Sequence, residues 1–377
     1  MIEKAYKYRF YPDEEQKSFL AKTFGSCRFV YNHFLHTKSS LWKEKKESLN
    51  YGNCSSLLKK LKEEFLWLKE ISSVCLQQVL RHLDRAYENF FKKRTQYPQF
   101  KSKYWKQSSH YMKNAFTWKN GKITLAKMKN ALDIRWSRSF KGEPTSLVVS
   151  KDTSGKYFIS IHVKENIQPH PFVKKEIAID LGLTTYMTNQ QGKGNINPRF
   201  SKIHQKRVKR IQQSLCRKTK GSNNRKKTRS KLAHLHQKIR DKRYDFLHKL
   251  SSKIVNENQV IVSEDLNVKE MQKNHRLAFS IGDASWGTFL NMLRYKSEWY
   301  GRDFVQVDRF FPSSKLCSYC EKKMEKMPLH IRNWVCSSCQ TVNHRDENAA
   351  KNLLKEGMKI LNCTAGHAGS YKPVESV

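Results

Sequence analysis

The sequence CSYCEKKMEKMPLHIRNWVCSSCQTVNHRDENAA, residues 317–350, decides how the C-terminal part of this chain is built. It holds four cysteines at C-x2-C-x15-C-x2-C spacing: Cys317, Cys320, Cys336 and Cys339. Each Cys-x-x-Cys pair offers two thiolates to one metal ion, so this spacing predicts a tetrahedral structural zinc site, a zinc ribbon. Asp346 then opens an Ala-rich segment. A ribbon is a generic module, so the function has to come from the chain around it.

The whole chain is strongly basic. Its 377 residues include 73 Lys and Arg against 33 Asp and Glu, a formal net charge of +40, and such a surplus repels itself unless a polyanion neutralises it. A hydrophobic content of 38% with 20 Phe, 16 Tyr and 8 Trp favours two or three folded domains over a disordered basic tail. No apolar run approaches the roughly 20 residues of a spanning helix, and residues 1–4 begin no signal peptide. The predicted partner is nucleic acid rather than a membrane.

The remaining cysteines show no pairing pattern: Cys27, Cys54, Cys75, Cys216 and Cys363. An odd number of cysteines without a secretory signal predicts a reducing compartment, where these residues act as small apolar side chains. The expected location is the cytoplasm.

The first 95 residues predict one strand and two long helices. Residues 5–11 alternate aromatic and basic side chains with the period of a half-buried strand, and Pro12 ends it. Asp13, with Gln16 three residues later, predicts a helix cap. Apolar side chains then form two helical stripes that we expect to be core: Leu20, Phe24, Cys27, Val30, Tyr31, Phe34 and Leu35, then Leu76, Val79, Leu80, Leu83, Tyr87, Phe90 and Phe91.

Between residues 97 and 170 the pattern changes to short β-type runs. They lie at residues 115–118, 122–125, 146–149 and 157–163, with turn pairs such as Asn120-Gly121 between them. This pattern predicts a small antiparallel sheet or barrel that the N-terminal strand can join. The helices of residues 13–95 would then be an insertion into that sheet.

After a linker at residues 168–171, the pattern is that of an α/β domain. Strands are expected at residues 177–180, 184–189, 260–264 and 304–307, and a helix at 348–361. Residues 199–243 contain a single carboxylate, Asp241, and two helical stripes around a turn at 220–224. Such a basic run is often only a solvent-exposed helix face. Here the nearly unbalanced positive charge favours a helical hairpin that binds along the phosphate backbone of a nucleic acid.

Three acidic residues occupy chemically suggestive places. Asp180 and Glu264 each close an apolar strand, and Asp346 opens a helix. Hydrolysis of a polynucleotide by two divalent ions needs several carboxylates around metals about 3.5–4 Å apart, and oxygen ligands suit Mg²⁺ or Mn²⁺. RNase H-like folds place such ligands on a central strand, a neighbouring strand and a packing helix. Taken singly, each residue has a plain alternative, a strand end facing solvent or a helix N-cap.

Three phrases that contain these residues resemble a known family: IDLGL at 179–183, IVSEDLN at 261–267 and RDENAAKN at 345–352. They are similar to the three RuvC motifs of the TnpB family, transposon-encoded RNA-guided DNA endonucleases related to type V CRISPR effectors. Further matching phrases lie at residues 4–9, 28–32, 98–102, 246–251, 311–315 and 364–368. The resemblance therefore covers nearly the whole chain.

The resemblance implies a multidomain α+β fold. A β-barrel wedge domain with a helical insertion would precede an RNase H-like (RuvC) α/β nuclease domain with a zinc-ribbon insertion. The implied bounds are 1–12 and 96–170 for the wedge domain, 13–95 for the helical recognition domain, 171–310 and 344–362 for the nuclease domain with its basic hairpin at 199–254, 311–343 for the ribbon, and 363–377 for a tail.

The resemblance also implies residue roles and partners. Asp180, Glu264 and Asp346 would be the catalytic ligands of Mg²⁺ or Mn²⁺, and the four ribbon cysteines would bind Zn²⁺. A guide RNA from the transposon end would direct the cutting of double-stranded DNA beside a short motif. Base pairing would read the target, so the protein would mainly bind backbones. The candidate nucleic-acid contacts are Gln77, Gln78, Arg81, Lys206, Arg207, Arg210, Arg225, Lys226 and Lys227.

The chain departs from the family pattern at three positions. Glu321 and Gln340 stand where members usually have a glycine after each cysteine pair, which relieves backbone strain near the metal, so weaker zinc binding is one expectation. His344 stands where an aspartate is common, two residues before Asp346.

Alternatives to an active endonuclease are distinguishable. A nuclease-inactive RNA-guided repressor is expected to lack a carboxylate, and all three are present. A compact type V CRISPR effector would be encoded beside a repeat array rather than a transposon end. A transposase that joins strands itself fits the RuvC likeness less well than hydrolysis does, and a plain zinc-ribbon binder leaves the three phrases unexplained. The sequence gives no oligomeric state.

Overall fold

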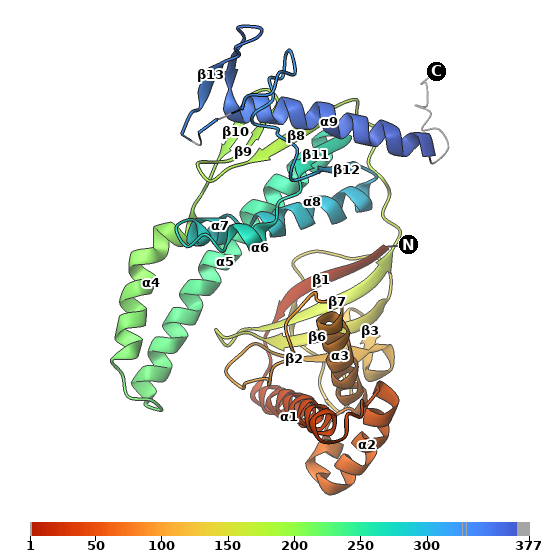
Figure 1. The fold of residues 1–377 in the computed structure, drawn as a ribbon. Coiled ribbons are helices and arrows are strands. Elements are labelled where there is room, and N and C mark those ends of the chain that lie inside the picture. Colours follow the sequence, from red (N-terminus) through yellow and green to blue (C-terminus); the bar gives the residue numbers. More distant parts are fainter. Residues whose placement is uncertain (1, 326, 329, 368–377) are drawn as a thin grey trace. The chain divides into compact units, whose positions relative to one another are not determined.

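The computed structural model describes residues 2–325, 327–328 and 330–367, which form two compact units divided between Asn166 and Ile167 (Figure 1). Each unit has its own hydrophobic core. Residues 368–377 of the predicted tail, and with them the end of the phrase at 364–368, lie outside the described residues. None of the described helices combines the length and apolar character needed to cross a bilayer.

The first unit is built on a five-stranded antiparallel sheet. Its order is β2 (Gln107–Met112), β6 (Pro144–Lys151), β7 (Tyr157–Glu165), β1 (Ile2–Phe10) and β5 (Ile134–Arg135). The N-terminal strand joins the sheet as expected, since β1 pairs with β7 along its whole length, from Ile2 opposite Glu165 to Phe10 opposite Tyr157.

The predicted barrel is not closed. Among the described residues no ladder joins the edge strands β2 and β5. Two features account for this: β5 has only two residues, and β3 (Phe116–Lys119) with β4 (Lys122–Leu125) forms a separate hairpin instead of extending the sheet. An open sheet with a neighbouring hairpin stands where the sequence predicted a barrel.

Three helices follow β1. They are α1 (Glu14–Lys45), α2 (Tyr51–Glu64) and α3 (Ser73–Phe91), with a 3-10 turn at Leu66–Glu70. Helices α1 and α3 pack on β2, and α2 packs on α3. The predicted cap is confirmed: Asp13 Oδ1 accepts the backbone N–H of Gln16, and Gln16 Oε1 accepts that of Asp13. All seven apolar residues of the first predicted stripe are buried. Phe91 of the second stripe is 73% exposed, because α3 ends there, beyond its contact with the core.

The second unit has a mixed five-stranded sheet. Its order is β10 (Gly194–Ile196), β9 (Thr185–Asn189), β8 (Glu176–Leu181), β11 (Val260–Glu264) and β12 (Asp303–Val307). Strands β8, β11 and β12 are parallel, and β9 and β10 run antiparallel to their neighbours. The four strands expected from the sequence are confirmed to within one or two residues.

Helices cover both faces of this sheet. Alternate strand residues point to opposite faces: Ile177, Ile179 and Ile261 share a core with α5 (Asn223–Glu257) and α8 (Trp286–Tyr300), whereas Ala178, Val260 and Val262 share one with α9 (Arg345–His367). Small residues bring α9 close to the sheet. Ala349 and Ala350 are fully buried, and a Cβ added at Gly357 would lie 2.5 Å from Val262 Cγ1.

A long helical hairpin projects from this core. Helix α4 (Phe200–Cys216) turns back into α5, whose first residues follow a Ser222 cap. At the base of the hairpin, the buried Asp283 of α7 (Ala278–Ala284) accepts hydrogen bonds from the backbone N–H groups of Ser201 and Lys202 and from the Arg243 guanidinium. Asp283 therefore caps α4, which has no side-chain cap of its own.

Candidate active site and metal centre

Two of the predicted carboxylates lie side by side at one end of the mixed sheet. Ile179 of β8 pairs with Ser263 of β11, so Asp180 and Glu264 follow at the next position of two adjacent parallel strands. In both strands the buried residues stop just before the carboxylate, and the strand ends at or next to it. Asp346 is the second residue of α9, which packs against β8. All three side chains are half-buried.

The charges of the other two carboxylates act on Asp180. Burial, followed by the charges of Asp346 and Glu264, raises the pKa of Asp180 to about 7, against the opposing charges of Arg345 and Arg332. Burial, followed by the charge of Asp265, raises the pKa of Glu264 to about 7. Asp180 and Glu264 therefore lie where negative charge is poorly solvated, and a cation beside them would stabilise the charged form.

One cationic side chain already reaches this group. Arg332 Nη1 donates to Asp346 Oδ1 at 2.7 Å, and the Arg332 carbonyl accepts the backbone N–H of Arg345, also at 2.7 Å. Within the described ranges, only the four cysteines bring three or more metal-binding atoms within 4.8 Å of one another, so the carboxylate oxygens are spaced more widely. Sequence reasoning missed Arg332, because its contact with Asp346 is visible only in space.

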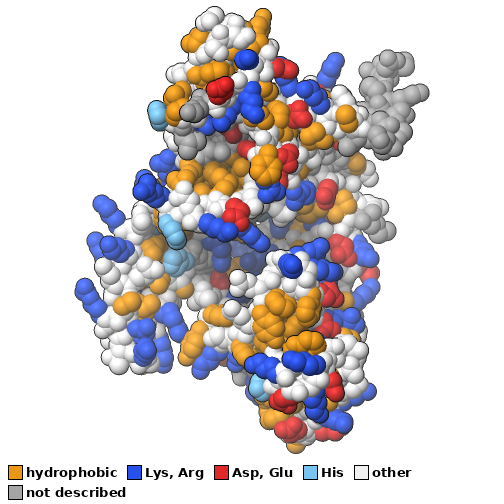
Figure 2. All heavy atoms as spheres, viewed as in Figure 1, with side chains coloured by type: hydrophobic (Ala, Val, Ile, Leu, Met, Phe, Trp, Pro, Cys, Tyr) orange, Lys and Arg blue, Asp and Glu red, His pale blue; other side chains and the backbone are white. Residues whose placement is uncertain are grey.

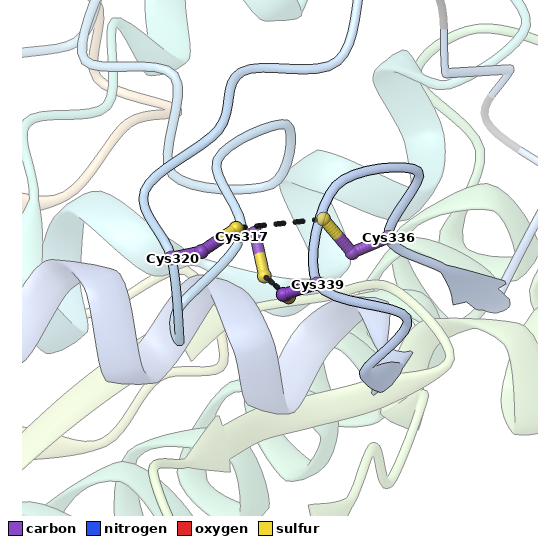
Figure 3. A group of neighbouring side chains, drawn as sticks. All are labelled: Cys317, Cys320, Cys336 and Cys339. Atoms are coloured by element: carbon purple, nitrogen blue, oxygen red, sulfur yellow. Dashed lines mark hydrogen bonds between the residues drawn. The ribbon is translucent and has the colours of Figure 1, made fainter.

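The four cysteines form a compact thiol cluster (Figure 3). Cys317 Sγ lies 3.6 Å from Cys339 Sγ, and Cys320 Sγ lies 3.6 Å from Cys336 Sγ. Four sulfurs around one Zn²⁺ at about 2.3 Å would be about 3.8 Å apart, so the cluster has the size of a tetrahedral metal site. The hydroxyl and backbone N–H of Thr341 lower the pKa of Cys339 to about 6, which favours a thiolate. The structure thus brings together all four predicted ligands.

Both cysteine turns have left-handed residues where a glycine is usual in the family. Glu321 has φ +61° and Gln340 has φ +58°. Their backbone N–H groups bond back to the carbonyls of Cys317 and Cys336 at 2.9 and 3.0 Å, so the turns close despite the unfavourable conformation.

The ribbon is attached to α9 by two buried asparagines. Asn348 Nδ2 donates to the Leu316 carbonyl at 2.7 Å, and Asn348 Oδ1 accepts the backbone N–H of Ser318 at 2.8 Å. Asn352 Nδ2 donates to the carbonyls of Ser313 and Leu316 at 2.8 and 2.6 Å. The first cysteine turn is therefore fixed to the helix that carries Asp346.

The predicted nucleic-acid contacts fall on two surfaces, one in each unit. On α3, Gln77 is exposed and Gln78 is half-buried, and the Arg81 guanidinium lies 4.4 Å from the centre of the Tyr51 ring. On the α4–α5 hairpin the exposed basic residues are Lys206, Arg207, Arg210, Lys226 and Lys227. Figure 2 shows that Lys and Arg dominate this hairpin on the face in view.

One predicted contact has a structural partner instead. Arg225 is half-buried, and its Nη1 donates to the carbonyls of Leu215 and Lys218 at 2.6 and 2.9 Å. Leu215 lies in the last turn of α4 and Lys218 just beyond it, where the helix dipole favours a cation. Arg225 thus closes the hairpin turn.

Comparison with known proteins identifies the family. Residues 158–275 match the OrfB_IS605 profile, described as "Probable transposase"; residues 286–353 match "Cas12f1-like, TNB domain". Residues 1–47 match "Helix-turn-helix domain", although here they form β1 and the single helix α1.

Full-length relatives and a solved structure agree with these matches. The chain is 45% identical to a "Putative RNA-guided DNA endonuclease" of Streptomyces pristinaespiralis over 97% of this chain and 92% of the relative. It is 30% identical to the Escherichia coli K12 protein of that name, InsQ, over 99% and 98%. A Cas12f1 chain, solved with single-guide RNA and target DNA, shares the fold at a TM-score of 0.55 and 13% identity, covering 93% of this chain and 98% of Cas12f1. The chain therefore belongs to the TnpB family, and the two relatives above are named as RNA-guided DNA endonucleases.

Proposed function

We propose that this protein is a transposon-encoded, RNA-guided DNA endonuclease that hydrolyses phosphodiester bonds at Asp180, Glu264 and Asp346. The observation that carries the proposal is the convergence of these carboxylates from two adjacent strands and one packing helix, where the charges of Asp346 and Glu264 contribute to the raised pKa of Asp180. The order of the sheet, with two antiparallel and three parallel strands between helical layers, supports an RNase H-like nuclease domain.

The carboxylates fit a pair of Mg²⁺ or Mn²⁺ ions. Hard oxygen donors suit these ions, and burial, with neighbouring negative charge, raises the pKa values of Asp180 and Glu264, so a divalent cation would stabilise their charged forms. Such ions would lower the pKa of water and stabilise the leaving oxygen. The chain itself contributes the positions: the paired strands fix Asp180 and Glu264, and α9 fixes Asp346. The half-buried setting limits the water that competes with these contacts.

We propose Zn²⁺ as the ion of the cysteine cluster, since four thiolates at this spacing form a closed structural site. Its role would be to hold the ribbon against α9, with Asn348 and Asn352 as the connection. The catalytic ions and the structural ion would thus have separate ligand sets.

Guide RNA and double-stranded DNA are the proposed partners. The net charge of +40 and the basic α4–α5 hairpin fit a protein that binds backbones while base pairing reads the target. Gln77, Gln78 and Arg81 on α3 are the proposed readers of the short motif beside the target, because amides and guanidinium groups pair with base edges.

The test is a comparison of two acidic residues at opposite ends of the same sheet. The protein is expressed with its flanking DNA, the copurifying RNA is sequenced, and the complex is assayed on a plasmid that carries the matching target. Asp180→Asn is expected to abolish cleavage while RNA and target binding persist. Asp303→Asn, at the other end of the parallel strands, is expected to cut normally. Unchanged cleavage by Asp180→Asn, or copurification of random cellular RNA alone, would refute the assignment.

A further inference from the structure

The segment between α3 and β2 exposes aromatic rings and cations that the proposed cleavage site does not use. Residues 97–106, YPQFKSKYWK, form what we call the aromatic-basic loop, with four aromatic residues and three lysines. Tyr104 and Trp105 are 59% and 54% exposed, and the flanking Lys103 and Lys106 are exposed as well. Two adjacent, solvent-exposed aromatic rings flanked by lysines are typical of a binding surface rather than of a hydrophobic core.

The loop is held in place on both sides of the two rings. Asn32 of α1 makes a pair of bonds with the Lys101 backbone: its Nδ2 donates to the carbonyl at 3.0 Å, and its Oδ1 accepts the N–H at 2.7 Å. Gln107 Nε2 donates to the carbonyls of Ser102 and Trp105 at 3.0 and 2.9 Å. A loop that is ordered in advance loses less conformational entropy when a partner binds.

The anchoring residues are themselves fixed. Arg28 Nη1 donates to Gln107 Oε1 at 2.8 Å, so the Gln107 amide is oriented towards the loop. The Lys101 ammonium lies 3.8 Å from the centre of the Tyr31 ring, so this lysine contacts α1 although it remains exposed. The exposed side chains of Lys103, Tyr104, Trp105 and Lys106 are therefore presented on a supported backbone.

We propose that the aromatic-basic loop binds an unpaired segment of the guide RNA, with bases stacked on Tyr104 and Trp105 and phosphates beside Lys103 and Lys106. That this RNA is the guide RNA rests on the proposed function. Unpaired RNA presents base faces to aromatic side chains, and lysines follow its backbone. A duplex keeps its base faces stacked inside and offers only phosphates to such a loop, which would leave the rings without a role.

The experiment compares three probes with the full-length chain by fluorescence anisotropy. The probes are an unstructured single-stranded RNA of about 20 nucleotides, the blunt RNA duplex of the same sequence and the matching single-stranded DNA. The double variant Tyr104→Ala/Trp105→Ala is expected to bind the single-stranded RNA about tenfold or more weakly, because each stacked base contributes substantially to affinity. Duplex binding is expected to change by about twofold or less.

Matched variants separate stacking from folding and from charge. Trp42→Ala removes a ring of similar exposure, 55%, that also lies near a lysine, and is expected to leave RNA affinity unchanged. Tyr104→Phe/Trp105→Phe is expected to restore binding. Lys103→Gln/Lys106→Gln is expected to reduce the slope of log affinity against log salt by about 0.7 per lysine, while the alanine pair leaves that slope unchanged.

Three outcomes would overturn the inference: unchanged affinity for single-stranded RNA, an equal loss for the duplex, or a loss confined to single-stranded DNA, which would assign the loop to the DNA strand. The inference and the proposed function fail separately. Asp180→Asn is expected to bind the RNA like the unsubstituted protein, so a failed loop test leaves the cleavage site standing, and an inactive cleavage site leaves RNA stacking testable.

Discussion

Arg332 Nη1 lies 2.7 Å from Asp346 Oδ1, so a side chain between the two cysteine pairs of the ribbon neutralises a carboxylate of the neighbouring helix. The backbone of Arg332 is held at the same place by its bond from the Arg345 N–H. The ribbon therefore places a positive charge beside Asp346, in addition to packing against α9.

Replacing Arg332 by Gln is expected to strengthen Mn²⁺ binding to the metal-free carboxylates. The guanidinium competes for Asp346, and the partly exposed ion pair is worth up to about 1 kcal/mol, so the expected gain is about two- to fivefold. Electron paramagnetic resonance of free Mn²⁺ measures it. Arg240→Gln is the control, since Arg240 is similarly exposed and pairs with Asp241 on α5. Weaker Mn²⁺ binding by the Arg332 variant would contradict this.

Asp180→Asn is expected to stabilise the protein in buffer without divalent ions. The folded-state pKa of Asp180 is raised to about 7, so the folded state binds more protons than the unfolded state between about pH 4 and pH 7. The contribution of Asp180 to the free energy of unfolding is therefore fully present below about pH 4, and it is lost as the pH rises through 7. Urea unfolding at pH 8 is expected to show a gain on the order of a few kcal/mol for the variant. The gain should disappear near pH 4; a gain of equal size at both pH values would point to another cause.

Gln340→Gly is expected to make the ribbon more resistant to loss of its metal. Gln340 has φ +58°, a conformation that glycine adopts without the penalty of about 1 kcal/mol or more for other residues. The rate of metal release to a chelating dye is the measurement. Ser338→Gly, in the same turn but without a positive φ, is expected to have the opposite effect because it only adds flexibility. Faster release from the Gln340 variant would refute the strain argument.

Asp283→Ala is expected to loosen the base of the basic hairpin. The substitution removes the cap of α4 and leaves the partly buried Arg243 without its ion partner, a loss of about 3 kcal/mol or more. Hydrogen exchange should accelerate in the first turn of α4. The exposed pair of Lys249 and Asp245 on α5 gives the control, Asp245→Ala, which should change exchange little.

Elements with a clear period could be predicted from the sequence. The capping box at Asp13, the strands that carry Asp180 and Glu264, and the cysteine cluster all depend on local patterns, and each was found. Helix α8 was missed although it buries Phe289, Leu290 and Leu293. Its apolar residues recur at helical spacing, which is a local pattern that predicts a helix.

Other features had no local signal. The open edge of the first sheet depends on how short β5 is. A strand of two residues is too short to show the alternation of apolar and polar side chains that predicts a strand. The contact between Arg332 and Asp346 and the role of Arg225 at the end of α4 arise from folding, since nothing in their spacing separates these arginines from the other basic residues of the chain. Tertiary contacts among charged side chains are therefore the part that sequence reasoning could not supply.

The close approach of Gly357 to Val262 makes α9 act as a lever. Asp346 lies eleven residues away along the same helix, about 16 Å at 1.5 Å per residue. A side chain at position 357, near the middle of α9, would push this part of the helix away from Val262 of β11, and the resulting tilt would displace the carboxylate near the N-terminal end. The geometry of the carboxylate group thus depends on a buried contact between α9 and β11, so loss of activity can originate well outside the site.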